Sequence, residues 1–160
     1  MSPPAHTDKQ YEAELAALRE KLLLMGAKVE GMIVDAMRSL VERDVAVAKA
    51  VIARDAEIDR LEIETDEMAL QLLALRQPAA SDLRFITEAM KIVTDLERIG
   101  DLATNIAERS EELITEPQLR PYVDLQREAA AVRTMLRDAL DAFALFQTHR
   151  TFSFAYIQSR

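Results

Sequence analysis

The stretch Thr94-Asp-Leu-Glu-Arg-Ile-Gly-Asp-Leu-Ala-Thr-Asn-Ile-Ala-Glu108 spaces Glu97, Asp101 and Asn105 at intervals of four residues. On a helix this spacing places the side chains on one face, as a polar stripe. Gly100 lies in the middle of that predicted helix, where a glycine costs about 1 kcal/mol relative to alanine. We therefore expect a neighbouring backbone or a bound ion to approach closely there. The alternative is a solvated acidic face beside an ordinary packing glycine.

The composition around this stretch indicates long helices. A chain of 160 residues suits one domain with a real core. Hydrophobic residues are 49% and charged residues 30%, with only 3 glycines and 5 prolines, which is typical of amphipathic helices. Cysteine is absent, which excludes disulfides and thiolate catalysis. The chain shows neither a signal peptide nor an apolar run of membrane-spanning length, so we expect a cytoplasmic protein without direct membrane insertion.

The charge pattern narrows the function classes. A net charge of −8 disfavours nucleic acid and anionic lipid, and it is compatible with metal cations or basic partner surfaces. The histidines, His6 and His149, lie near opposite ends of the chain, and no Glu-x-x-His pair is present. Redox di-iron chemistry is therefore not expected. Because no nucleophile–base pair or phosphate-binding glycine loop is visible, we predict that the protein is not an enzyme.

Apolar spacing predicts an all-α fold. Residues 11–42 form a heptad-like seam, and apolar residues between 47 and 75 define a second helix after a tight reversal at Arg43-Asp44. A third helix is expected over 82–114, with Ser81 as its N-cap. Three long helices with short turns predict an antiparallel, up-down-up three-helix bundle.

A fourth long helix is predicted after a connector bracketed by two prolines, and it continues to Phe146. Its segment 132–143 is similar to segment 29–40, which indicates an internal repeat; chance similarity between two amphipathic helices is the alternative. The similarity then stops, because residues 148–160 have neither acidic residues nor a helical phase. The predicted parts are a three-helix repeat (1–116), the first helix of a second, incomplete repeat (117–147), and a divergent tail (148–160).

The second predicted helix carries an acidic stripe of its own, formed by Asp55, Asp59 and Glu62. In an antiparallel hairpin that turns near Ala79, this stripe lies level with the stripe on the third helix. Carboxylates this close repel one another unless they are protonated or bridged by a cation, and oxygen ligands suit hard cations or iron. The alternative is that both stripes face solvent and pair weakly with arginines. Those arginines are Arg54, Arg60 and Arg98.

Three segments resemble the PhoU family of bacterial regulators of phosphate uptake: Met25-Gly-Ala-Lys-Val-Glu30, Arg76-Gln-Pro-Ala-Ala-Ser-Asp-Leu-Arg84 and Asp95-Leu-Glu-Arg-Ile-Gly-Asp101. The resemblance covers residues 11–146. It implies tandem three-helix repeats, each with an E(D)xxxD motif that binds metal. In some members of the family the bound metal is an iron cluster. That motif matches Glu97-Arg-Ile-Gly-Asp101 here.

The resemblance also implies a ligand set. Asp55-Ala-Glu-Ile-Asp59 shows the same pattern on the facing helix, and Asn105, one turn beyond Asp101, is a possible ligand. Glu62 is a further candidate because of its place in the acidic stripe of the second helix. The implied cofactor is iron or another hard divalent cation, whose identity stays open.

As a function, the resemblance implies a negative regulator of phosphate uptake and phosphate-starvation signalling. Such a protein is an adaptor between the ATPase subunit of the Pst phosphate transporter and a sensor histidine kinase, and it forms a homodimer. Asp82 and Arg84 are candidate partner contacts, with capping and salt bridging as the alternative. The second repeat expected in this family is missing after Gln147. A metal-binding helical protein, or a truncated bundle fragment without a signalling role, is therefore the competing interpretation.

Overall fold

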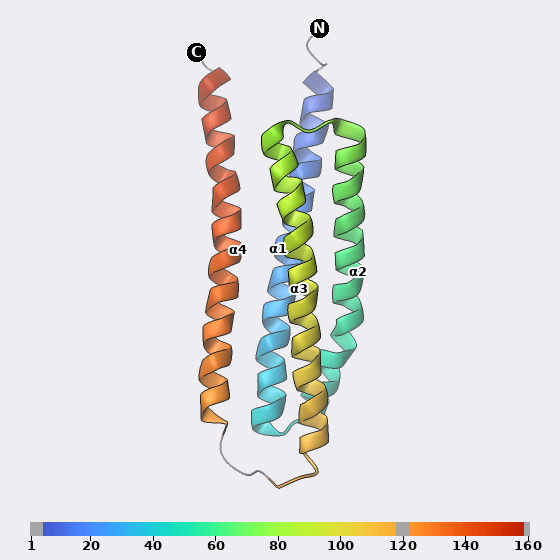
Figure 1. Cartoon of the computed structure of the whole chain (residues 1–160), viewed down its shortest axis with the longest axis vertical. Coiled ribbons are helices and arrows are strands. Elements are labelled where there is room, and N and C mark those ends of the chain that lie inside the picture. The colour runs from blue at the N-terminus through green and yellow to red at the C-terminus, as the bar shows by residue number, and fades with distance from the viewer. Residues whose placement is uncertain (1–4, 118–121, 159–160) are drawn as a thin grey trace. The chain divides into compact units, whose positions relative to one another are not determined.

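The computed structural model describes residues 5–117 and 122–158, and every regular element within them is an α-helix (Figure 1). The helices are α1 (Ala5–Glu42), α2 (Val45–Arg76), α3 (Ala80–Leu113) and α4 (Val123–Gln158). The predicted all-α class is confirmed. Helices α1, α2 and α3 pack against one another in the predicted up-down-up order, and α4 belongs to a second compact unit.

The core of the bundle is formed by the apolar seams of α1, α2 and α3. Burial of these side chains is the main force that holds the helices together, at roughly 1.5–3 kcal/mol for each large aliphatic residue. The largest fully buried apolar residues are Leu18, Leu22, Met25, Val29, Met32, Val51, Ile58, Ile86, Val93 and Leu96. Three buried hydroxyls in this core bond backbone carbonyls of their own helices, so they are satisfied locally.

The reversal between α1 and α2 lies at Arg43 and Asp44, as predicted. Arg43 has a left-handed backbone with φ of 57°, and the Asp44 carboxylate accepts hydrogen bonds from the amides of Ala46 and Val47 at 2.9 and 3.2 Å. The Arg43 guanidinium also donates to carbonyl oxygens at the end of α3, 2.6 Å from Ile114 O. It donates likewise to Leu113 O and Glu116 O, so this turn fixes the end of α3.

Arg43→Ala is expected to lower the free energy of unfolding by about 1–2 kcal/mol, because it removes a charged donor from the negative end of a helix. Urea denaturation followed by circular dichroism measures the change. Arg38→Ala is the matched control, since Arg38 is half exposed and, among the described residues, its one ion pair is with Asp35 on its own helix. That control should change stability by less than about 0.5 kcal/mol. Equal effects of both variants would contradict the capping role of Arg43.

The turn between α2 and α3 differs from the prediction at one residue. Pro78 keeps Gln77 out of the right-handed helical region, and Gln77 takes a left-handed conformation with φ of 46°. Ser81 is not the N-cap; Ala79 is, with no side-chain hydrogen bond, and Ser81 lies inside the first turn of α3. The N-cap prediction was wrong because the chain is already helical at Ala80, one residue before the serine.

Helix α4 also differs from the prediction. It continues to Gln158, so residues 148–158 are helical although their sequence shows no helical apolar phase. No glycine or proline interrupts residues 123–158, and nothing local therefore ends the helix. The side chains beyond Ala144, including Phe146, lie outside the described residues. No described helix is long and apolar enough to cross a membrane.

Candidate metal centre

Helices α2 and α3 pair closely beside the stretch that contains Gly100. A Cβ atom added at Gly100 would lie 3.3 Å from Cγ2 of Ile58, which is 1% exposed. Ile58 and Gly100 are equally far in sequence from Ala79. The Thr104 hydroxyl donates to Asp55 Oδ1 at 2.9 Å, at almost the same distance from the turn. The predicted register of the two helices, in which residues equally far from the turn lie opposite one another, is confirmed. Gly100 permits the close approach.

This pairing gathers carboxylates from both helices into one cluster. Asp55 and Asp59 of α2 and Asp101 of α3 each offer an oxygen, and these oxygens lie within 4.8 Å of one another. Asp55 and Asp101 are half-buried, whereas Asp59 is exposed. At this separation each pair of charges repels by roughly 1–3 kcal/mol for effective dielectric constants of 80 to 20. The cluster is thus unfavourable when fully ionised.

Two further acidic residues surround the cluster. Burial raises the pKa of Glu97, and the charges of Asp101 and Glu62 raise it further. Burial also raises the pKa of Asp59, and the charges of Asp55 and Asp101 add to this effect. Glu97 and Glu62 are both half-buried. The five carboxyls therefore share one region of negative potential.

In chelator-treated protein, acidification is expected to stabilise the folded state through Asp59 and Glu97. In the folded protein their pKa values lie above the ordinary values of 3.8 and 4.5. At a pH between the ordinary and the raised pKa of either group, the folded chain therefore holds more protons than the unfolded chain. This contribution grows as the pH falls through the raised folded pKa values and is complete below the ordinary ones. The measurement is urea denaturation of the wild type and of an Asp59→Asn/Glu97→Gln double variant between roughly pH 7 and 4.

The wild type should gain stability relative to that double variant as the pH falls. The comparison cancels Glu14 and Glu64, whose pKa values are lowered chiefly by hydrogen bonds from Arg76 and Lys21 and whose contributions run the other way. A difference between the two proteins that is independent of pH would contradict the prediction.

The arginines considered as partners for the stripes do not neutralise the cluster. Arg54 turns to α1, where its Nη2 lies 2.5 Å from Asp35 Oδ2. Arg60 and Arg98 are exposed, and neither forms an ion pair within residues 5–117 and 122–158. The negative charge of the cluster is therefore not compensated by those arginines.

The remaining site residues behave differently from one another. Asn105 is exposed one turn beyond Asp101, and it has no hydrogen bond to the cluster in the described part of the chain. Thr104 was missed by the sequence analysis, although it is almost as far from Ala79 as its partner Asp55. Its position opposite Asp55 in the hairpin register is the signal that could have identified it, because a hydroxyl there can donate to the carboxylate. Thr104 fixes one oxygen of Asp55 and leaves the other available.

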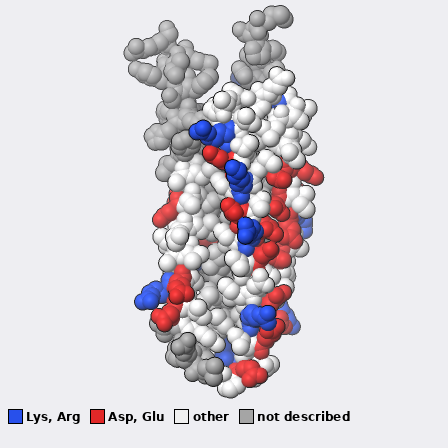
Figure 2. Space-filling model, viewed as in Figure 1, with Lys and Arg blue, Asp and Glu red and all other residues white. Residues whose placement is uncertain are grey.

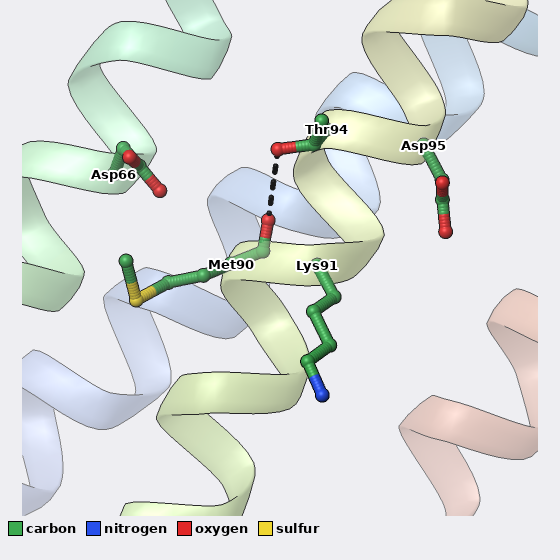
Figure 3. A pocket seen from close by; sticks show the side chains of 5 residues that line it. All are labelled: Asp66, Met90, Lys91, Thr94 and Asp95. Atoms are coloured by element: carbon green, nitrogen blue, oxygen red, sulfur yellow. Dashed lines mark hydrogen bonds between the residues drawn. The ribbon is translucent and has the colours of Figure 1, made fainter.

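An open hollow lies between α2 and α3, nearer to their turn than the cluster is, and is shown in Figure 3. Asp66 of α2 faces Met90 and Thr94 of α3 there, and the Thr94 hydroxyl donates to Met90 O at 3.3 Å. Lys91 and Asp95, also of α3, complete the lining. The acidic character of the α2 side thus extends from Asp55 to Asp66.

The candidate partner contacts lie at the start of α3. Asp82 is half-buried and accepts a hydrogen bond from the Tyr11 hydroxyl at 3.3 Å, which ties α1 to α3. Arg84 is exposed. At least one oxygen of Asp82 therefore serves the bundle itself, as the capping and bridging alternative expects, while partner contact stays a prediction for both residues.

The donor set of the cluster fits a hard cation. Its ligand atoms are carboxylate oxygens without histidine or cysteine, a set that suits Mg²⁺, Mn²⁺, Ca²⁺ or iron. Burial raises the pKa values of Asp59 and Glu97, and repulsion among the neighbouring carboxylates adds to this effect; a cation would neutralise those carboxylates.

These features define a class of protein: an antiparallel helical bundle with an acidic cluster where two of its helices approach closely. Residues 22–110 match the PhoU domain, and the chain belongs to the PhoU family. It is 46% identical over 151 residues to the phosphate-specific transport system accessory protein PhoU homolog of Pseudomonas putida. That alignment covers 94% of this chain and 59% of the relative.

Solved structures agree with this assignment. The crystal structure of PhoU from Pseudomonas aeruginosa is similar with a TM-score of 0.82 and 41% identity, covering 91% of this chain and 70% of that one. The phosphate transport system regulatory protein PhoU from Streptococcus pneumoniae gives a TM-score of 0.79 and 32% identity, with 91% and 69% covered. This chain spans 59% of the length of the Pseudomonas putida relative.

Proposed function

We propose that this chain acts as a PhoU-type negative regulator of phosphate uptake and phosphate-starvation signalling, by binding rather than by catalysis. The observation that carries the proposal is the match to the PhoU domain over the three-helix bundle that holds the acidic cluster. Relatives that share this domain are named accessory proteins of the phosphate-specific transport system.

The acidic cluster is proposed as a metal site within that function. Asp55, Asp59 and Asp101 would hold the cation, with Glu97 and Glu62 beside them. When bound, a divalent cation supplies positive charge that neutralises the repelling carboxylates. The protein residues would then tie α2 to α3 across the Gly100 contact, which stabilises the helix pair that forms this face. Asn105 is kept as an outer ligand, since a water could bridge it to the cation.

The partners proposed for this regulator are the ATPase subunit of the Pst transporter and a sensor histidine kinase, with the chain acting in the cytoplasm as a homodimer. The names of the relatives support a role beside a phosphate-specific transport system, and the exposed start of α3 at Arg84 offers a contact surface. Asp82, beside Arg84, is proposed to orient that segment through its bond to Tyr11.

Pull-down of the full chain against the transporter ATPase and against the kinase tests the proposal. Binding to at least one of them is expected, and Arg84→Glu should weaken it. Glu108→Gln, an exposed change near the other end of α3, is the matched control. The absence of binding to both partners, in Mn²⁺ and in chelator alike, would contradict the adaptor role.

A second candidate is a metal-binding helical protein without a signalling role, which the acidic cluster alone favours. Metal analysis of the purified protein, together with its mass in solution, separates the candidates. Retained metal without partner binding supports this second candidate. Neither metal nor partner binding supports a bundle fragment that only folds.

A further inference from the structure

The outer face of α2, on the side away from the bundle core, exposes two large aliphatic side chains. Ile63 is 57% exposed and Leu70 is 52% exposed, and they lie two helical turns apart on one face. Ala56 and Ala74 extend the same face and are also exposed. We call these four residues the α2 outer stripe. The core side of α2 is formed instead by residues such as Ile58, five positions from Ile63 and therefore well around the helix.

Carboxylates border both aliphatic residues of the α2 outer stripe. Asp66 and Glu67 follow Ile63 by three and four residues and precede Leu70 by four and three, so they flank both side chains. Asp59 lies one turn before Ile63 on the same side. Figure 2 shows Asp and Glu side chains gathered over α2, whereas both signs alternate along α3 in the middle of the view.

Ion pairs among the described residues do not include this acidic border. On the side of α2 that faces α1, Glu57 and Glu64 pair with Lys28 and Lys21. Asp66 and Glu67, by contrast, form no ion pair with any residue in the described ranges. The α2 outer stripe is thus an apolar surface at which three carboxylates, Asp59, Asp66 and Glu67, outnumber the one nearby cation of α2, the exposed Arg60.

The charge selects what can cover this strip. Anionic lipid and nucleic acid are repelled by it, and a second copy would bring a net charge of −8 and the same acidic face. A basic amphipathic helix matches it, because its aliphatic side chains would cover Ile63 and Leu70 while lysine or arginine met Asp66 and Glu67. We propose that the α2 outer stripe docks a basic amphipathic helix of a partner protein. The proposal does not depend on the metal site.

A labelled synthetic peptide tests this docking. The probe is a helix of about 18 residues with leucines two turns apart and lysines flanking each leucine. Fluorescence anisotropy with the full chain, in chelator, measures its affinity. Ile63→Ser/Leu70→Ser is expected to weaken binding by at least about tenfold. Asp66→Asn/Glu67→Gln should weaken it to a similar degree and flatten its dependence on salt, since steering by those charges is screened.

Matched controls isolate the face. Leu24→Ser/Leu102→Ser replaces two residues of 50% and 62% exposure on α1 and α3, and it should leave binding unchanged. Because all these positions are exposed or half-buried, circular dichroism should show unchanged helix content in every variant.

Several results would overturn the proposal. Equal binding of a scrambled peptide would show attraction by charge alone, and unchanged binding of Ile63→Ser/Leu70→Ser would place the contact elsewhere. Co-sedimentation with anionic vesicles that these substitutions abolish would assign the face to a membrane. A concentration-dependent increase in mass that they abolish would assign it to a second copy of the chain.

Discussion

Asp101→Asn lowers the affinity for Mn²⁺ by about 10- to 100-fold while the helix content stays unchanged, if the acidic cluster is a metal site. The substitution removes one carboxylate of the three whose oxygens lie within 4.8 Å of one another. It leaves the side chain nearly the same in size, so the contact between α2 and α3 persists. Isothermal titration calorimetry measures the affinity and circular dichroism the helix content.

The same variant should behave in the opposite way without metal. In chelator, Asp101→Asn removes a charge that raises the pKa of both Asp59 and Glu97, and so relieves repulsion in the folded state. We expect the melting temperature to rise by roughly 1–4 °C. A loss of stability in chelator would show that Asp101 supports the fold directly, and an unchanged Mn²⁺ affinity would remove it from the site.

Asp95→Asn is the matched control for this prediction. Asp95 is exposed on the same helix and lies outside the acidic cluster. It removes one negative charge, as Asp101→Asn does, so any general electrostatic effect on Mn²⁺ binding appears in both variants. Only the excess loss in Asp101→Asn is specific to the cluster.

Gly100→Val lowers the free energy of unfolding by about 1–3 kcal/mol, because the new side chain overpacks a buried contact. Even a methyl group at Gly100 would lie 3.3 Å from Ile58, whose side chain is buried against it. The valine pushes α2 and α3 apart and should therefore weaken Mn²⁺ binding as well. Urea denaturation and calorimetry on the same preparation measure both effects.

Gly31→Ala provides the contrast. The nearest atom to a Cβ at Gly31 is at 4.0 Å, in the side chain of Arg54, so an alanine fits there. Replacing a helical glycine in open space should raise the free energy of unfolding by about 0.5–1 kcal/mol. If Gly100→Val were equally stabilising, the close approach of α2 and α3 would not exist in solution.

Local sequence predicted most of the bundle because apolar periodicity is a local property. The seams of α1, α2 and α3 and the reversal at Asp44 follow from residue spacing and a capping side chain. Ser81 failed as an N-cap because the residue at which α3 begins depends on how the turn at Pro78 positions the chain. The prediction that the fourth helix ends near Phe146 was wrong: residues 148–158 lack an amphipathic pattern, but they also lack a glycine or proline that would end the helix.

Only part of the candidate site could be predicted from the sequence. Spacing alone placed Glu97 and Asp101 on one stripe. The register of the hairpin placed Asp55 and Asp59 opposite them, because an antiparallel hairpin has one register once its turn is known. The hydrogen bond from the Thr104 hydroxyl to Asp55 and the ion pair of Arg54 with Asp35 could not be predicted from the sequence. Both depend on side-chain choices among several neighbours, which spacing does not rank.

The sequence by itself determined that the chain is helical, acidic and built from three paired seams, since helix periodicity and charge are written residue by residue. It also indicated a close neighbour at Gly100, with an ordinary packing glycine as the alternative. Only the tertiary structure decided that this neighbour is Ile58, and that carboxylates of two helices share one cluster. The physical reason is that the repulsion between Asp59 and Asp101 depends on the distance between their carboxylates. The packing of α2 against α3 sets that distance, and their separation in sequence does not.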